Sequence, residues 1–136
     1  MVELYNSFTA KEFLEIVESV GFKSYSESQV KKALNNTMYM VKATVDGKLA
    51  GIGRVVGDGS VACMLTSISV KPEFQKQGIG LRIVERLKQM VEHGVKPGER
   101  IQIELVPTAG NEQFYMKAGF KYKPEKVTGM YLWIEK

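Results

Sequence analysis

The most informative part of the chain is the stretch Ser67-Ile68-Ser69-Val70-Lys71-Pro72-Glu73-Phe74-Gln75-Lys76-Gln77-Gly78-Ile79-Gly80, which reads as a strand, a glycine-bearing turn and the start of a helix. At a helix start several backbone N–H groups have no intrahelical partner, and the helix dipole adds partial positive charge. A diphosphate can therefore be held there by the backbone alone. Gly78 and Gly80 would let such a ligand approach the chain closely. The stretch predicts a phosphate-binding turn.

The bulk composition is typical of one ordinary globular domain. The chain has 136 residues, of which 44% are hydrophobic and 25% are charged, enough apolar residues to build a core. No apolar run approaches the roughly 18 residues of a membrane span, and residues 1–5 lack the order of a signal peptide. We therefore expect a single domain over residues 1–136, located in the cytoplasm, with no membrane partner.

Few residues are available for metal or disulfide chemistry. Cys63 is the single cysteine and His93 the single histidine, so the sequence predicts neither an intramolecular disulfide nor a metal site. The formal charge of +4 is spread along the chain, without a dense basic block interleaved with aromatic residues. This charge suits a small anionic ligand at least as well as nucleic acid, which we do not expect as a partner.

The region before the turn predicts one strand, two helices and a three-stranded meander. Thr9-x-x-Glu12 and Ser26-x-x-Gln29 are capping boxes that open two helices. Asp46-Gly47 and Asp58-Gly59-Ser60 are hairpin signals that join three strand-like runs. The elements expected here are a strand at 2–5, helices from 9 and from 26, and strands at about 37–45, 48–57 and 61–70.

The region after the turn predicts a long helix and a parallel strand. Apolar residues recur with helical spacing from Ile79 to Val91, and Gly94 stops that helix. The run 101–106 is then a buried strand. Since a strand, helix and strand of this length form a right-handed crossover, this strand should lie parallel to the strand before the turn. The chain would end with a short helix at about 111–118 and strands near 120–123 and 129–135.

This order of elements resembles the GNAT superfamily of acyl-CoA N-acyltransferases over essentially the whole chain. Gln75-x-x-Gly78-x-Gly80 is similar to the pyrophosphate motif of that family, and Asn111 with Phe114-Tyr115-Met116-Lys117-Ala118-Gly119-Phe120 is similar to its second hallmark. The joint occurrence is specific, because the first motif also sits at a strand-to-helix junction. The resemblance implies a mixed α/β fold with a largely antiparallel sheet of about seven strands, splayed between the fourth and fifth, and about four helices on both faces.

The resemblance also implies which residues bind acetyl-CoA, the expected co-substrate. Backbone N–H groups of the turn would hold the diphosphate, while Ile68 and Val70 would pair with the pantetheine arm much as a peptide adds to a sheet edge. Asn111 would contact the cofactor near its thioester end. The full set expected to bind the cofactor is Ile68, Ser69, Val70, Gln75, Lys76, Gln77, Gly78, Ile79, Gly80, Asn111 and Tyr115.

Acyl transfer to an amine requires an acid for the departing thiolate and a donor for the carbonyl oxygen. Tyr115 is the candidate acid, because a phenol is protonated at neutral pH and can donate to a thiolate. By the resemblance, its hydroxyl would point at the sulfur. The backbone N–H of Ile68 is the candidate donor for the carbonyl oxygen.

The reaction also requires a base for the amine, and relatives often carry an acid at the position of Ser67. Glu104 is the leading substitute, because burial in its strand would raise the pKa of the carboxyl toward a useful range. Glu104 could instead form an ion pair with Arg100 or a lysine. A water chain through Ser67 and Thr66 is a further candidate.

Arg54 and Ser67 are the candidate residues for binding the acceptor, which we expect to be a primary amine of a small molecule or a peptide. Arg54 lies in the strand at 48–57, which after Lys48 at its start is otherwise apolar apart from its glycines. Its guanidinium could bind an acidic group of the acceptor or simply reach solvent. Cys63 could carry the acyl group in a two-step route, but without a neighbouring histidine signal a packed strand cysteine is favoured.

The leading function is therefore an N-acetyltransferase that works by direct transfer in a ternary complex. A catalytically weak acyl-CoA sensor or regulatory module of the same fold is the alternative, because Ser67 replaces the usual acid. Nucleic-acid binding is a third and disfavoured class. A homodimer is also considered, since the run 130–134 would present an apolar edge that a second copy could cover.

Overall fold

The computed structural model describes residues 1–127, 129–133 and 135–136. Contacts between Cα atoms divide the chain into two compact units, Met1–Val106 and Pro107–Lys136. The first unit holds the whole described sheet and three α-helices, and the second holds one short α-helix. That the chain forms a single domain over 1–136 stays a prediction.

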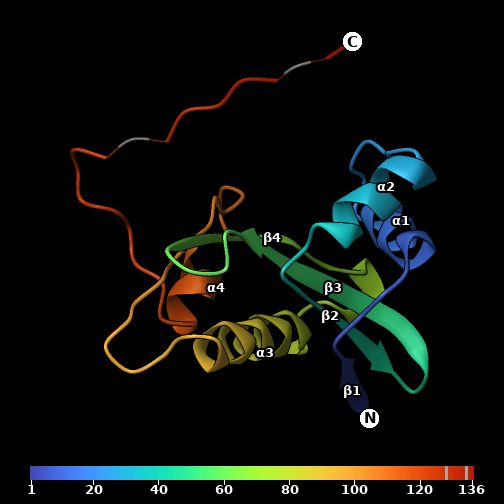
Figure 1. Ribbon diagram of the computed structural model, residues 1–136. Coiled ribbons are helices and arrows are strands. Elements are labelled where there is room, and N and C mark those ends of the chain that lie inside the picture. Colours follow the sequence, from blue (N-terminus) through green and yellow to red (C-terminus); the bar gives the residue numbers. More distant parts are fainter. Residues whose placement is uncertain (128, 134) are drawn as a thin grey trace. The chain divides into compact units, whose positions relative to one another are not determined.

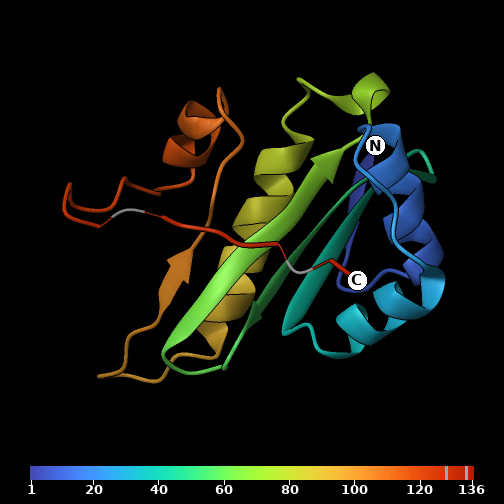
Figure 2. The ribbon, with the colours of Figure 1, turned by 90° about the horizontal axis from the view of Figure 1, so that it is seen from above.

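The first unit is built on an open five-stranded sheet in which spatial order follows chain order. The first three pairings are antiparallel and the last is parallel, which confirms the predicted crossover (Figure 2). The strands are β1 (Val2–Tyr5), β2 (Tyr39–Val45), β3 (Lys48–Gly57), β4 (Ala62–Val70) and β5 (Gln102–Glu104).

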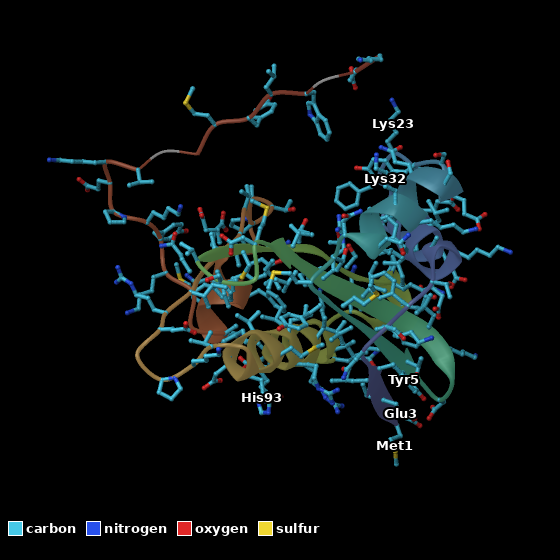
Figure 3. All side chains as sticks on the ribbon, in the orientation of Figure 1. Met1, Glu3, Tyr5, Lys23, Lys32 and His93 are labelled. Atoms are coloured by element: carbon cyan, nitrogen blue, oxygen red, sulfur yellow. The ribbon has the colours of Figure 1, made fainter. Side chains whose placement is uncertain are left out.

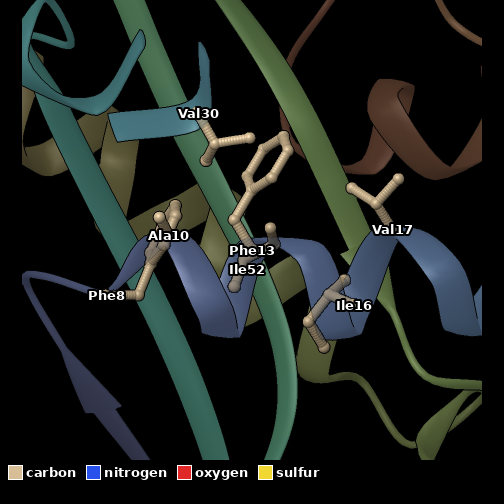
Figure 4. Close-up of a cluster of buried hydrophobic side chains, with 7 residues drawn as sticks. All are labelled: Phe8, Ala10, Phe13, Ile16, Val17, Val30 and Ile52. Carbon is tan, nitrogen blue, oxygen red and sulfur yellow. The ribbon is translucent and has the colours of Figure 1, made fainter. Parts of the chain in front are cut away.

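Helices cover both faces of this sheet, with α1 (Ala10–Ser19) and α2 (Glu27–Asn35) on one face and α3 (Ile79–His93) on the other (Figure 1). The capping box at Thr9 that opens α1 is present. Alternate residues of β3 serve the two faces. A cluster under α1 and α2 contains the β3 residue Ile52 and is shown in Figure 4, where the Phe13 ring lies beside Val30.

The hairpin turns form where the sequence predicts them. Asp46 and Gly47 have φ angles of 50° and 80°, so the two-residue loop between β2 and β3 has the left-handed backbone of a type I′ turn. In the next loop, the Asp58 carboxylate accepts backbone N–H groups of Ser60, Val61 and Ala62. These contacts lower the pKa of Asp58 and hold the loop in place.

A β-bulge interrupts the pairing of β3 with β4. Ile52 lies opposite Ser69 and Arg54 lies opposite Thr66, so β4 holds one residue more than β3 across this interval. Ser67 lies within the bulge and has a φ of 58°, a left-handed conformation that a non-glycine residue adopts at a cost of about 1 kcal/mol or more. Bulges bend a strand and change where its side chains point.

The two final strands of the sequence-based prediction are wrong for the residues that the structure describes, which carry five strands instead of about seven. Residue 134, inside the second of these strands, lies outside the described residues. A turn closes at 124–127, where the Val127 N–H donates to the Pro124 C=O. The apolar side chains Met130, Tyr131, Leu132 and Trp133 are largely exposed. Two strands alone are marginal in water, and here no described ladder pairs them.

The second unit contains α4 (Glu112–Lys117). The Tyr115 ring makes edge-to-face contacts with the rings of Phe114 and Phe120, at centroid distances of 4.9 Å and 6.2 Å. Ala118, which ends the helix, is buried. The three rings therefore form a small, half-buried aromatic cluster around the short helix.

Substitution of Gly53 by alanine should destabilise the first unit. A Cβ at Gly53 would lie 2.5 Å from Cδ1 of Ile68 and 2.7 Å from Cγ2 of Ile83. Because both neighbours are packed, Gly53→Ala should lower the free energy of unfolding by about 1–3 kcal/mol in urea titrations. Gly129→Ala is the matched control, since nothing lies within 4 Å of its added Cβ. Equal stability of the two variants would contradict the packing described for β3.

Candidate functional site

The turn between β4 and α3 leaves a helix start open to a ligand. Gly78 is the N-cap of α3 with a φ of 80°, and no side chain caps the helix. Lys76 also has a left-handed backbone, with a φ of 61°. Among the described residues, the N–H groups of Ile79 and Gly80 donate to no protein acceptor, and the first backbone bond of the helix is Arg82 N–H to Gly78 C=O. These are the donors of an anion site.

The side chains of the turn are folded back onto the backbone. The Gln75 amide donates to the Val70 C=O at 2.9 Å, which ties the turn to the last residue of β4. The Gln77 amide makes a longer contact of 3.4 Å to the Glu73 C=O. The two glutamines therefore shape the turn, and the backbone is left to bind.

One edge of β4 is open over more than half of the strand. β5 pairs with β4 only at Ala62, Cys63 and Met64. From Leu65 to Val70, β4 is paired with β3 alone among the residues that the structure describes. The predicted splay between the fourth and fifth strands is thus confirmed. It leaves outward-facing N–H and C=O groups that an extended ligand can bond.

The predicted binding residues of the first unit fit the two ends of an acyl-CoA. Ile68, Ser69 and Val70 lie on the open edge of β4, and Gln75 to Gly80 form the turn that follows it directly. The polar pantetheine arm needs backbone partners along a strand, and the diphosphate needs clustered N–H donors. The donor set present in this chain matches both needs.

Arg54 and Ser67 are brought together by the bulge. The Arg54 Nε–H donates to Ser67 Oγ at 3.0 Å, and an Arg54 terminal nitrogen donates to Thr37 Oγ1 at 3.1 Å. The Cζ atom of Arg54 lies 6.0 Å from the centroid of the Phe13 ring. Both predicted acceptor residues therefore lie on the face of the sheet that α1 covers.

Burial lowers the pKa of the Arg54 guanidinium, and interaction with Tyr25 raises it. An arginine stays protonated near neutral pH in spite of such shifts. Arg54 is therefore a half-buried permanent cation beside Ser67.

Glu104 lies at the end of β5, in register with Met64 of β4 and half-buried. Ser67 is farther along β4, beyond the point where β5 stops pairing. Within the described residues, no hydrogen bond joins Glu104 to Arg54 or to Ser67. Its role as a base stays a prediction.

The second unit carries Asn111 and Tyr115 on one short helix. Asn111 is the N-cap residue of α4, and its side-chain amide makes no capping hydrogen bond. Tyr115 is half-buried, and this burial raises the pKa of its hydroxyl. A raised pKa keeps the phenol protonated at neutral pH, as a proton donor requires.

The described residues give less support to a nucleophilic cysteine, a metal site or a membrane-spanning helix. Burial and the nearby Asp58 raise the pKa of the Cys63 thiol, which disfavours a nucleophilic thiolate. Among the described residues, no three or more His, Cys, Asp or Glu side chains gather as a metal site would require. None of the described helices has the length and apolar character needed to span a membrane.

The sequence of residues 6–130 matches the family described as "Acetyltransferase (GNAT) domain". The chain belongs to the GNAT acetyltransferase family. This match confirms the resemblance drawn from the turn and the second motif. Members of this family generally use acetyl-CoA.

Curated relatives of this GNAT chain carry N-acetyltransferase names. An uncharacterised N-acetyltransferase, ycf52, of Pyropia yezoensis is 27% identical over 124 residues, which cover 88% of this chain and 69% of that protein. GCN5-related N-acetyltransferase 2, chloroplastic, of Arabidopsis thaliana is 30% identical over 85 residues, or 62% of this chain. The match spans only 31% of the Arabidopsis protein.

Solved structures share the GNAT fold of this chain. A probable acetyltransferase of unknown function from meticillin-resistant Staphylococcus aureus superimposes with a TM-score of 0.87 at 23% identity, covering 98% of this chain and 100% of that one. A GNAT-family acetyltransferase from Streptococcus pneumoniae gives a TM-score of 0.73 at 22% identity, covering 99% and 98%. These similarities confirm the predicted fold class, with a sheet of fewer strands than expected.

Sequence reasoning missed three residues around Arg54. Thr37 and Phe13 contact its guanidinium, and Tyr25 interacts with it electrostatically. Aromatic residues near the loop between α1 and α2 were a weak signal for Tyr25. No local pattern could have found Thr37, because its bond to Arg54 joins residues 17 positions apart in the chain.

A negative charge at the N-cap of α3 should weaken cofactor binding. Asp and Asn both tolerate a left-handed backbone and have nearly the same shape, so Gly78→Asp and Gly78→Asn differ mainly in charge. The aspartate would repel a diphosphate at the helix start, and we expect a Kd for acetyl-CoA about 10-fold higher than in the asparagine variant. Calorimetric titration measures both. Equal affinities would rule out the turn as the diphosphate site.

Proposed function

We propose that this GNAT chain transfers an acetyl group from acetyl-CoA to a primary amine of a small molecule or a peptide, by direct transfer in a ternary complex. The observation that carries the proposal is the continuity of two donor sets that the described residues leave open, the unpaired edge of β4 and the uncapped start of α3. Only a few residues separate them, and the Gln75 amide ties the turn to Val70.

Acetyl-CoA supplies the acetyl group as a thioester, and the chain positions it. Backbone groups of Ile68 and Val70 would hold the extended arm, and the N–H groups of Gly78 to Gly80 would hold the diphosphate. The N–H of Ile68 would polarise a carbonyl oxygen placed beside it. A fixed backbone donor needs no reorganisation as negative charge develops on that oxygen.

The proposed acetyl transfer also requires two proton transfers. The attacking amine must lose a proton, and the thiolate that leaves as the C–S bond breaks must gain one. Tyr115 is proposed as the donor to the thiolate, with Asn111 near the thioester. Glu104, or water reached through Ser67 and Thr66, is proposed as the acceptor of the amine proton.

A serine at position 67, where relatives often carry an acid, favours a second candidate function. This is an acyl-CoA-binding sensor or regulatory module with little turnover. A serine is not a competent base alone, and here its hydroxyl oxygen accepts from Arg54. Thiol release from acetyl-CoA with a panel of primary amines separates the two functions. Release above the rate without amine supports the transferase, whereas calorimetric binding without release for any amine supports the sensor.

The cytoplasmic location and the homodimer also remain proposals. The Arabidopsis relative is named as chloroplastic. The exposed apolar residues from Met130 to Trp133 support a surface that a second copy could cover. We propose no nucleic-acid or membrane partner and no metal cofactor.

Loss of the Tyr115 hydroxyl should slow the reaction and spare cofactor binding. In Tyr115→Phe the thiolate leaves without its proton donor, so we expect kcat to fall by about 100-fold while the Kd for acetyl-CoA stays within about twofold. Tyr5→Phe, in an exposed residue of β1, is the control and should retain full activity. Unchanged kcat in Tyr115→Phe would remove Tyr115 from the role of acid.

Removal of the Glu104 carboxylate tests the base. If Glu104 accepts the amine proton, Glu104→Gln should lower kcat/KM. Steady-state rates measured across pH give the profile, with Glu99→Gln on the neighbouring loop as the control. A profile identical to that of the wild type would leave the water route through Ser67 as the proposal.

A further inference from the structure

Arg54 is a half-buried cation whose described partners are all uncharged. Its guanidinium donates to the hydroxyls of Ser67 and Thr37, and within the described residues no Asp or Glu forms an ion pair with it. Its remaining N–H groups donate to no protein acceptor in that part of the chain, and none of its nitrogens is both fully buried and without a partner. A guanidinium taken partly out of water is costly unless its charge and donors are satisfied. The arrangement therefore suits an anion supplied from outside the chain.

Two of the three carboxylates on α1 are held by lysines, and the third, Glu18, accepts from the Ser24 hydroxyl. Glu12 of α1 pairs with Lys42 of β2 at 2.7 Å, and Glu15 pairs with Lys71 at the end of β4. Glu12 has its lysine partner in the sheet and Glu15 has one just after β4, and neither carboxylate is bonded to Arg54. The charge of Arg54 is thus left unmatched although carboxylates lie on the helix that covers it.

The planar guanidinium of Arg54, whose paired N–H donors form a fork, is held in a fixed orientation before any ligand binds. The Thr37 hydroxyl donates to the Ala33 C=O at 2.9 Å, which leaves its oxygen turned to accept from Arg54. Phe13 lies under the guanidinium, and its ring is tilted against that of Tyr25 at a centroid distance of 6.5 Å. A fixed guanidinium loses little entropy on binding and presents paired donors that match a carboxylate or a phosphate.

The place of Arg54 relates it to the proposed reaction. Ser67, bonded to Arg54, directly precedes Ile68, whose N–H is the proposed donor to the acetyl carbonyl. A group bound by Arg54 would therefore lie within about one side-chain length of the acetyl carbon. Lys23 and Lys32 project from the α1 and α2 end of the unit (Figure 3), and both are exposed. Their charges would favour the approach of an anion.

We propose that the acceptor is a small primary amine bearing a carboxylate or a phosphate a few bonds from its nitrogen, and that Arg54 binds this group. Ser67 and Thr37 occupy two of the donors, and the free part of the fork takes the anion. The inference rests on the proposed acetyl transfer and names the acceptor class for it. It selects against simple alkylamines, which offer Arg54 no anion, and against polyamines, which would bring a second positive charge to it.

The first test compares matched acceptors in the thiol-release assay. β-Alanine, γ-aminobutyrate and O-phosphoethanolamine carry the anion, and propylamine, butylamine and ethanolamine are their counterparts without it. We expect kcat/KM to be at least about 10-fold higher for the better anionic acceptor than for its counterpart. The size of this preference in each of the three pairs also shows whether the site favours a carboxylate or a phosphate. Equal or better use of the counterparts would overturn the inference and leave the proposed transferase standing.

The second test removes the cation. Arg54→Met should abolish the preference for the anionic acceptor, mainly through KM, while Arg54→Lys keeps the charge without the fork and should retain part of it. Arg86→Met is the matched control, because Arg86 of α3 donates to Asn6 and should leave the preference intact. A Kd for acetyl-CoA that is unchanged in Arg54→Met shows that the variant is folded. A preserved preference in Arg54→Met would overturn the inference.

A binding measurement covers the case in which no amine is acetylated. NMR titration of the complex with CoA, using γ-aminobutyrate and O-phosphoethanolamine as probes, should show binding to the wild type that is at least about 10-fold weaker in Arg54→Met. This result without turnover would support the anion site and reject the transferase. No binding, or equal binding to the two proteins, would reject the anion site itself.

Discussion

The structure depends on where the pairing between β4 and β5 stops. Because β5 bonds only Ala62, Cys63 and Met64, the second half of β4 keeps one edge of backbone N–H and C=O groups open. A sheet edge of this kind is normally covered or blunted, since it attracts another chain. Here it leads directly into the uncapped start of α3. A long ligand with a polar arm and a diphosphate would satisfy both sets of groups at once.

The β-bulge adds the second constraint. It inserts one residue into β4, puts Ser67 in a left-handed conformation and brings its hydroxyl to Arg54. The bulge thus separates two uses of one strand. In the proposed function the edge of β4 would serve the cofactor, and the face toward α1 carries a fixed cation that would bind the acceptor. Strain at Ser67 is stored where the two uses meet, as is common at functional sites.

Much of the fold could be predicted because its signals are local. The capping box at Thr9, the Asp46-Gly47 turn and the crossover around α3 each follow from a few neighbouring residues. The surroundings of Arg54 could not be predicted, since its contacts to Thr37 and Ser67 join distant residues of three different segments. The final strands were wrong for the described residues because alternating apolar side chains form a strand only where a partner pairs with them.

Hydrogen exchange of the backbone amides, with and without acetyl-CoA, tests the central claim most directly. If the open edge of β4 and the start of α3 hold the cofactor, the amides of Ile79 and Gly80, and those of the outward-facing residues among 68–70, should gain protection when it binds. Amides of β1, at the opposite edge of the sheet, should not change. Binding of acetyl-CoA that left the amides of 68–70 and 79–80 unprotected would contradict the account.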